Sequence, residues 1–141
     1  MEADLNYAVN RLGEGFSMVI VRNGRVLFES RKHGLSGLVE AIDKCGGLLK
    51  GSSIADKVVG KAAAMLIAYA GMVNVYASTL SIHGKQELEK HGIHYRYGKI
   101  VQYIAGRDKE KLCPFERLTM EMSDPAEAYM KIKSYMKRMG E

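Results

Sequence analysis

The stretch FSMVIVRNGRVLFE, residues 16–29, decides the fold of this chain. Two runs rich in β-branched and aromatic residues flank Asn23-Gly24. Both central positions of a two-residue hairpin turn need a positive φ, which Asn and Gly adopt at low cost. We therefore predict a β-hairpin over residues 16–29.

Helical patterns flank this hairpin. Apolar residues at helical spacing predict a helix over about residues 4–12 and a second one ended by Gly46 and Gly47. After a loop over residues 48–52, Ser53-Ile54-Ala55-Asp56 has the spacing of a capping box, in which a serine and an acidic residue satisfy each other's backbone N–H groups. This predicts a helix from Ser53 to about Ala70, with Gly60 in its interior at a cost of about 1 kcal/mol relative to alanine.

The second half alternates strands with helices. Alternating side chains predict a buried strand over residues 72–80, followed by a turn at 81–84, a short helix over 85–91 and one or two strands within 93–105. Two further helices are expected to begin near Pro114 and Pro125. Strands separated by single helices favour parallel pairing with right-handed crossovers. We predict an α/β fold, a three-layer α/β/α sandwich around a mixed sheet, in one domain spanning residues 1–141.

Composition excludes several classes of protein. The net charge is +5, but basic and acidic residues are interspersed, so we expect solvated helix faces and no nucleic-acid surface. The acidic N-terminus does not have the order of a signal peptide, and the longest uncharged apolar stretch, residues 62–73, is too short to span a bilayer. We expect a cytoplasmic protein without a membrane partner, and its methionine-rich last helix suggests a homodimer.

The order of elements resembles the cytidine-deaminase-like fold. In that fold a hairpin precedes a helix with the first zinc ligand, a strand leads into a helix with two more, and a parallel strand follows, with the signature H-x-E…P-C-x-x-C. Residues 75–83 resemble the strand and turn that deliver the cysteine pair, and residues 92–108 resemble the next strand. Residues 56–64 and 113–116 are similar to a small bacterial family of unassigned function within that superfamily.

The zinc-binding residues of that signature are replaced in this chain. The overlay places Asp56 at the zinc-ligating histidine and Val58 at the catalytic glutamate, with His83 and Gln86 at the two cysteines. Zinc normally takes at least three protein ligands, and a valine cannot shuttle a proton. The resemblance therefore implies a degenerate deaminase-like domain, and we predict no metal site, no cofactor and no zinc-dependent deamination.

One candidate site combines two segments. Asp56, Lys57 and Lys61 would lie on the first turns of the predicted helix, where free N–H groups and lysines can hold an anion; alternatively, they form a capped helix with solvated lysines. Ser81 and His83 would follow the end of a parallel strand, where open α/β sheets bind ligands, unless they only complete a turn.

Glu116 would lie near this site, or would reach back to the chain at residue 113 in a structural role. We predict that these six residues bind a small anionic or nucleotide-like ligand.

An alternative function is a metal-free enzyme that uses Cys113 as nucleophile or redox centre. A helix start favours the thiolate, and a nucleophilic cysteine also needs a base, for which His83, His91 and His94 are the candidates. The simpler interpretation is an inert cysteine that contributes only to packing.

Overall fold

The computed structural model describes residues 2–105 and 112–140. It contains one five-stranded sheet of order β2-β1-β3-β4-β5. The strands are β1 (Met18–Arg22), β2 (Arg25–Ser30), β3 (Ser53–Val59), β4 (Asn74–Ser81) and β5 (His94–Val101). β1 is antiparallel to both β2 and β3, whereas β3, β4 and β5 are parallel. The predicted mixed sheet with an N-terminal hairpin at its edge is confirmed.

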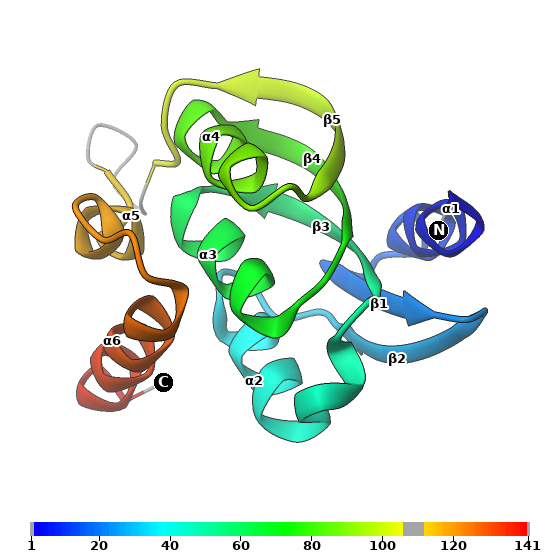
Figure 1. Cartoon of the computed structure of the whole chain (residues 1–141), viewed down its shortest axis with the longest axis horizontal. Helices are drawn as coiled ribbons and strands as arrows, with labels where there is room; N and C mark the ends of the chain where they lie inside the picture. The colour runs from blue at the N-terminus through cyan, green and yellow to red at the C-terminus, as the bar shows by residue number, and fades with distance from the viewer. Residues whose placement is uncertain (1, 106–111, 141) are drawn as a thin grey trace.

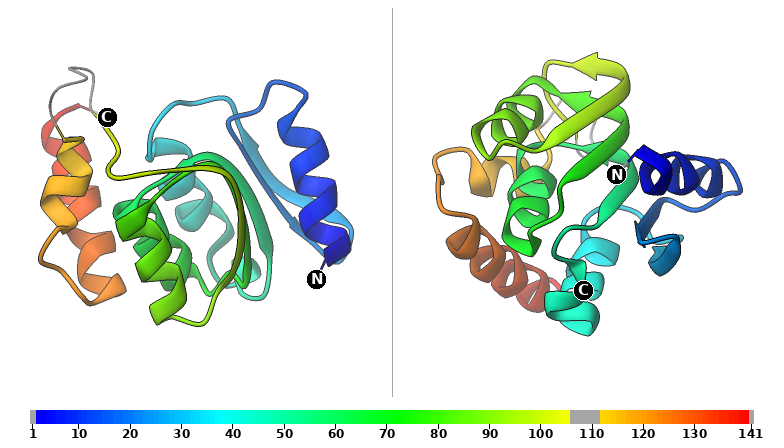
Figure 2. Two further views of the ribbon diagram at one scale, coloured as in Figure 1. Left: turned by 90° about the horizontal axis from the view of Figure 1, so that it is seen from above. Right: turned by 45° about the vertical axis from the view of Figure 1, so that its right-hand side comes forward.

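Helices cover both faces of the sheet, as Figures 1 and 2 show. The helices are α1 (Glu2–Leu12), α2 (Ser36–Cys45), the 3-10 turn η1 (Gly46–Leu49), α3 (Lys61–Ala70), α4 (Ile82–Lys90), α5 (Pro114–Thr119) and α6 (Pro125–Arg138). α1 lies alone on one face, and α2, α3 and α4 cover the other. The predicted three-layer α/β/α architecture is therefore confirmed. In addition, α5 and α6 pack against the outer side of α3.

The hairpin turn has the predicted conformation. Asn23 and Gly24 have φ angles of 52° and 77°. Asp4 of α1 accepts hydrogen bonds from the backbone N–H groups of both turn residues, each at 2.9 Å. The turn is therefore held by the helix that covers this part of the sheet.

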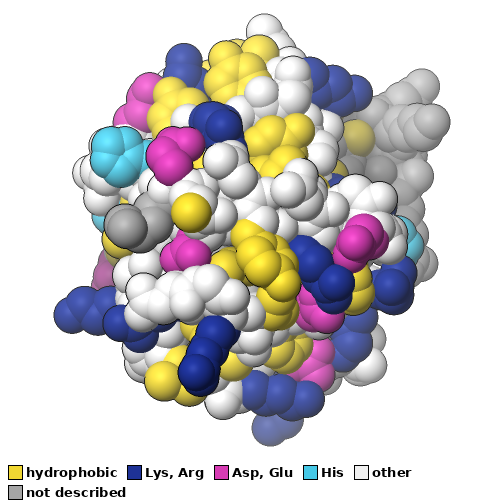
Figure 3. All heavy atoms as spheres, turned by 90° about the vertical axis from the view of Figure 1, so that its right-hand side faces the viewer, with side chains coloured by type: hydrophobic (Ala, Val, Ile, Leu, Met, Phe, Trp, Pro, Cys, Tyr) yellow, Lys and Arg dark blue, Asp and Glu magenta, His cyan; other side chains and the backbone are white. Residues whose placement is uncertain are grey.

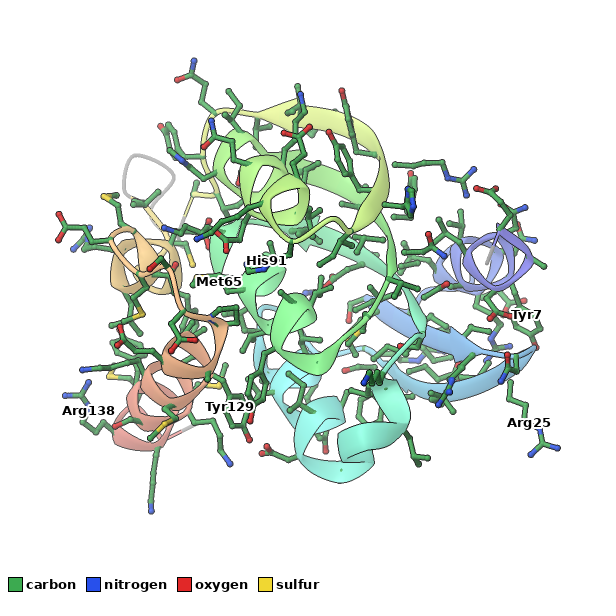
Figure 4. All side chains as sticks on the ribbon, in the orientation of Figure 1. Tyr7, Arg25, Met65, His91, Tyr129 and Arg138 are labelled. Atoms are coloured by element: carbon green, nitrogen blue, oxygen red, sulfur yellow. The ribbon has the colours of Figure 1, made fainter. Side chains whose placement is uncertain are left out.

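The main core lies between the sheet and the helices α2, α3 and α4. Ile20, Ile54 and Met65 are fully buried there, and Figure 4 shows Met65 pointing into the interior from α3. Tyr129 of α6 stacks on Tyr69 of α3 with ring centroids 4.6 Å apart and donates its hydroxyl hydrogen to Asp43 of α2. α6 is thus fixed to two helices of the core layer.

Residues 53–59 form a central strand, so the helix predicted from Ser53 is wrong in its first part. Ser53 is fully buried between β1 and β4, and Ile54, Val58 and Val59 suit a strand. The serine and aspartate match the capping-box spacing by coincidence, because the sequence pattern does not specify the sheet neighbours. α3 begins at Lys61, after Gly60, so the glycine lies at the helix cap and not in its interior.

α4 also begins earlier than predicted, at Ile82 instead of Lys85. The Ser81 side chain accepts a hydrogen bond from the backbone N–H of Gly84 at 2.9 Å, which is the geometry of a helix cap. The predicted turn at residues 81–84 is therefore the first turn of this helix.

The surface agrees with the charge pattern. On the face shown in Figure 3, lysine and arginine side chains are interspersed with acidic ones and do not gather in one patch. In the described part of the chain, no helix combines the length and apolar character required to cross a membrane.

Candidate functional site

A pocket opens between the beginnings of α2 and α3. β2 and β3 both run antiparallel to β1, so their carboxyl ends lie at the same edge of the sheet. The pocket at this edge has a volume of about 180 Å³. It is lined by the end of β3, the loop before α2, the first turns of α2 and α3, and the residues Cys113, Phe115 and Glu116. We call it the Asp56 pocket after its central carboxyl group.

Asp56 is a carboxyl group of this pocket whose surroundings change its pKa strongly. Its Oδ1 accepts a long hydrogen bond, 3.4 Å, from the backbone N–H of Val58. Burial raises the pKa of Asp56 from 3.8 to about 7, although the N–H groups of Val58 and Lys57 act in the opposite direction. The side chain is only half-buried, because part of it faces the pocket. Near neutral pH this carboxyl can both accept and donate protons, a property common at functional sites.

The remaining lining divides into an apolar interior and a basic rim. Met18, Leu38 and Phe115 supply apolar surface. Lys57 is exposed at the end of β3, and Lys32 pairs with Glu40 at 3.1 Å. The pocket therefore offers apolar contact, the carboxyl group of Asp56 and nearby positive charge, and it also borders the carboxyl group of Glu116.

Glu116 closes one side of this pocket by capping α3. Its carboxylate accepts hydrogen bonds from the backbone N–H groups of Lys61 at 2.7 Å and Ala62 at 2.9 Å. The pKa of Glu116 is raised, because the effect of burial exceeds the opposing effects of these N–H groups and of the charges of His83 and Lys61. The structural role predicted for Glu116, a contact back to residue 113, is wrong. The side chain instead caps α3, which is distant in sequence. Two N–H groups that a ligand anion would use are already taken.

A second pocket lies on the other side of Glu116. It has a volume of about 340 Å³ and is lined by Lys61, His83, Gln102, Tyr103, Leu112, Glu116 and Met120. We call it the Lys61 pocket. It lies beyond the carboxyl ends of β4 and β5, since His83 follows β4 and Gln102 follows β5 directly.

The six residues predicted to bind a ligand do not all line the same pocket. Asp56 and Lys57 line the Asp56 pocket, Lys61 and His83 line the Lys61 pocket, and Glu116 borders both. Ser81 is fully buried and lines neither pocket, since its hydroxyl group caps α4.

The predicted arrangement of Asp56, Lys57 and Lys61 on one helix is wrong. The first two lie on β3, and only Lys61 lies on α3. The two lysines therefore do not share a helix face at which they could hold one anion.

Cys113 lines the Asp56 pocket, whereas the histidines proposed as its base lie elsewhere. His83 lines the other pocket, His91 pairs with Glu87 at 2.8 Å, and His94 begins β5. His33, which the sequence analysis missed, lines the same pocket as Cys113. Its position after β2 is a detectable signal, because polar residues at the carboxyl end of a strand are candidates for ligand contact.

The structure also corrects the overlay on the deaminase signature. The resemblance implies a layout in which the first ligand-bearing helix follows the hairpin and the second follows the next strand. These helices are α2 and α3 here, so the overlay on residues 55–58 and 81–86 is displaced by one strand–helix unit. Ser36 and Gly37 begin α2, and Gly60 and Lys61 stand at the start of α3. Across residues 2–105 and 112–140, no three His, Cys, Asp or Glu side chains are grouped to hold a metal ion.

Known structures share this fold. A DUF1893 family protein from Thermotoga maritima is 30% identical, with a TM-score of 0.86 over 96% of this chain and 91% of the other. A diaminohydroxyphosphoribosylaminopyrimidine deaminase/5-amino-6-(5-phosphoribosylamino)uracil reductase from Thermotoga maritima is 19% identical, with a TM-score of 0.51 over 84% of this chain and 40% of the other. The dCMP deaminase of cyanophage S-TIM5, in complex with dCMP and dUMP, is 17% identical, with a TM-score of 0.50 over 68% of this chain and 94% of the other.

The relationship to the first of these proteins extends to sequence. Comparison with curated proteins gave no match. A family model described as a domain of unknown function, DUF1893, matches residues 8–136. The chain belongs to the DUF1893 family, whose members shown here have a deaminase-like fold.

Proposed function

We propose that this chain binds a small nucleotide-like ligand in the Asp56 pocket. A planar hydrogen-bonding group of the ligand would lie against Asp56, and an anionic group would lie at Lys57 and Lys32. The observation that carries this proposal is a carboxyl group with a pKa of about 7 inside a largely apolar pocket between α2 and α3.

The chemistry of Asp56 suits a nucleobase. An ionised carboxylate accepts hydrogen bonds from adjacent ring and amino N–H groups, and a protonated one also donates. A volume of about 180 Å³ lies below the range of about 300–1,000 Å³ that is typical for drug-sized ligands. The pocket therefore suits one ring, with the rest of the ligand extending to the basic rim.

The fold supports the choice of pyrimidine compounds as probes. The dCMP deaminase of cyanophage S-TIM5 was seen in complex with dCMP and dUMP. The sequence of this chain lacks the H-x-E…P-C-x-x-C signature of zinc deaminases, so binding without zinc-dependent deamination is the function we propose.

Thermal unfolding with dCMP, dUMP, cytidine and inorganic phosphate tests the proposal. A ligand at 100 times its dissociation constant stabilises the native state by about 2.7 kcal/mol, which gives a measurable shift in Tm. We expect Asp56→Asn to abolish the shift and Lys57→Ala to reduce it. Lys99→Ala serves as the matched control, because this exposed lysine of β5 lines neither pocket. Equal shifts in all variants, or no shift with any probe, would refute the proposal.

A metal-free enzyme is the second candidate, because Cys113 shares the Asp56 pocket with His33 and Asp56. The imidazole of His33 and the carboxylate of Asp56 are both suited to accept the proton of the Cys113 thiol and so to activate the sulfur as a nucleophile. Cys45 lies elsewhere, with its Sγ 3.8 Å from the carbonyl oxygen of Leu27, and is an internal control.

Alkylation with iodoacetamide, followed by mass spectrometry, tests this candidate. We expect faster modification of Cys113 than of Cys45, and a slower reaction of Cys113 after Asp56→Asn or His33→Gln. Equal rates for both cysteines in the native protein would exclude an activated Cys113.

A further inference from the structure

The Lys61 pocket has the size of a ligand site and lies where open α/β sheets bind ligands. Its volume of about 340 Å³ falls within the usual range for small-molecule sites. Its walls follow the carboxyl ends of the parallel strands β4 and β5, through His83 and Gln102. The pocket proposed above for nucleotide-like ligands lies at β2 and β3, so the two are different places in the fold.

The pocket contains the ammonium group of Lys61, which forms no salt bridge with a carboxylate of the described residues. The Nζ of Lys61 donates to the carbonyl oxygen of Met120 at 2.8 Å. Both oxygens of Glu116 already accept backbone N–H groups at the start of α3. His83 adds an imidazole from the first turn of α4. An incoming anion would therefore meet an ammonium group and a histidine, beside a Glu116 carboxylate whose oxygens are already bound to backbone N–H groups.

Apart from Gln102, the other walls are apolar, and they are partly open to solvent. Tyr103 is 49% exposed and Met120 is 55% exposed, and Leu112 lies beside them in the lining. Large apolar side chains that face a cavity together are a common feature of binding sites. Methionine in particular adapts its shape to different ligands.

We propose that the Lys61 pocket is a second binding site, for a small molecule that carries a carboxylate or phosphate on an apolar body. The anionic group would bind Lys61 and His83, and the apolar body would contact Tyr103 and Met120. Glu116 separates this site from the Asp56 pocket, because its carboxylate borders both. The proposal does not depend on nucleotide binding at Asp56.

Titration of the ¹⁵N-labelled protein with benzoate and with phenyl phosphate tests this site by NMR. Phenol, which lacks the anionic group, and inorganic phosphate, which lacks the apolar body, are the comparison probes. We expect saturable shifts of the Gln102, Tyr103 and His83 amides with benzoate, phenyl phosphate or both, and weaker effects with phenol and inorganic phosphate. The relative affinities of the two anionic probes distinguish a carboxylate site from a phosphate site.

Lys61→Met removes the charge and the hydrogen bond to the Met120 carbonyl oxygen but keeps a long apolar side chain. We expect Lys61→Met to weaken the binding of benzoate or phenyl phosphate to the Lys61 pocket about tenfold or more. Lys57→Ala and Asp56→Asn should leave the dissociation constant of the same probe at this pocket unchanged. Circular dichroism establishes that each variant is folded. The proposal is overturned by the absence of saturable shifts, by equal binding in Lys61→Met, or by shifts confined to the Asp56 pocket.

Discussion

Gly60 and Glu116 fit together so closely that residue 60 has no room for a side chain. A Cβ placed on Gly60 would lie 2.2 Å from Oε1 of Glu116 and 2.5 Å from its carboxyl carbon. The φ of Gly60 is −106°, which other residues also adopt, so the glycine is required by the neighbouring carboxylate and not by its backbone conformation. The carboxylate in turn is held by the first N–H groups of α3.

Replacement of Glu116 should destabilise the fold. Glu116→Ala leaves two N–H groups at the start of α3 without their acceptor, and we expect a loss of about 1–3 kcal/mol in the free energy of unfolding. Glu116→Gln keeps one acceptor oxygen and should lose less. Urea denaturation measures both values, with Glu121→Ala as a control at an exposed position nearby. A loss no larger than that of the control would contradict the capping role.

The fit between Gly60 and Glu116 predicts strong coupling in a double-mutant cycle. Gly60→Ala alone should be clearly destabilising, because the new methyl group displaces the carboxylate from the helix start. In the Glu116→Ala background the same methyl group gains space, so we expect a much smaller additional loss. Additive effects in urea denaturation would show that the two residues are energetically independent.

The two hydrogen bonds that Asp4 of α1 accepts from the hairpin turn give a separate prediction. Asp4→Ala removes the acceptor for the N–H groups of Asn23 and Gly24, and we expect the protein to lose about 1–3 kcal/mol of stability. Glu2→Ala, on the same helix but exposed, should change the stability little. Thermal unfolding of both variants provides the comparison, and similar Tm values would argue against a structural role for Asp4.

Local sequence signals predicted those parts of the fold that local interactions determine. The hairpin was predictable because Asn23 and Gly24 supply the positive φ angles that its turn needs. The Ser53–Val59 segment was not, because its serine and aspartate match a helix cap equally well. Its central place between β1 and β4 depends on contacts with residues far away in the sequence. That misassigned strand also displaced the comparison with the deaminase signature.

The sequence identified residues of the candidate site, but it did not predict how they are arranged in space. The sequence identified Asp56, Lys61 and Glu116 as residues of interest, but it did not show that a carboxylate would separate two pockets. The hydrogen bond from Lys61 to Glu116 spans 55 positions in the chain. No periodicity or motif reports a pairing of this kind, because it depends on the packing of α5 against α3.

Zinc should not stabilise this protein. The starts of α2 and α3 present Ser36, Gly37, Gly60 and Lys61, and the carboxylate of Glu116 is engaged by backbone N–H groups. His33, Asp56 and Cys113 line one pocket, but no three His, Cys, Asp or Glu side chains of the described residues are grouped to hold a metal ion. Three ligands are the usual minimum for a zinc site. We expect the Tm of metal-stripped protein to remain unchanged when zinc is added, with a zinc-binding peptide as the positive control for free metal. A saturable rise in Tm would require a zinc site and would reopen metal-dependent chemistry.

The pH dependence of stability should depend on Asp56. Its pKa is about 7 in the native state and 3.8 when unperturbed, so between these values the native state holds a proton that the unfolded state has released. Stability contributed by this group is therefore complete below about pH 4, falls as the pH rises and is lost above about pH 7. The change has an upper limit of about 4 kcal/mol, and the partial exposure of the Asp56 side chain to solvent reduces it.

Asp56→Asn removes this titration because an amide stays neutral. We expect the variant to be more stable than the original protein at pH 8 and to have a smaller decrease in stability between pH 4 and pH 7. Glu116 contributes a slope of the same sign, because burial also raises its pKa, so the slope should not vanish. Urea denaturation across this pH range, with Glu121→Gln as the exposed control, measures the difference. Equal slopes in the original protein and in Asp56→Asn would mean that the Asp56 carboxyl group is ionised at the same pH in the folded and unfolded chains.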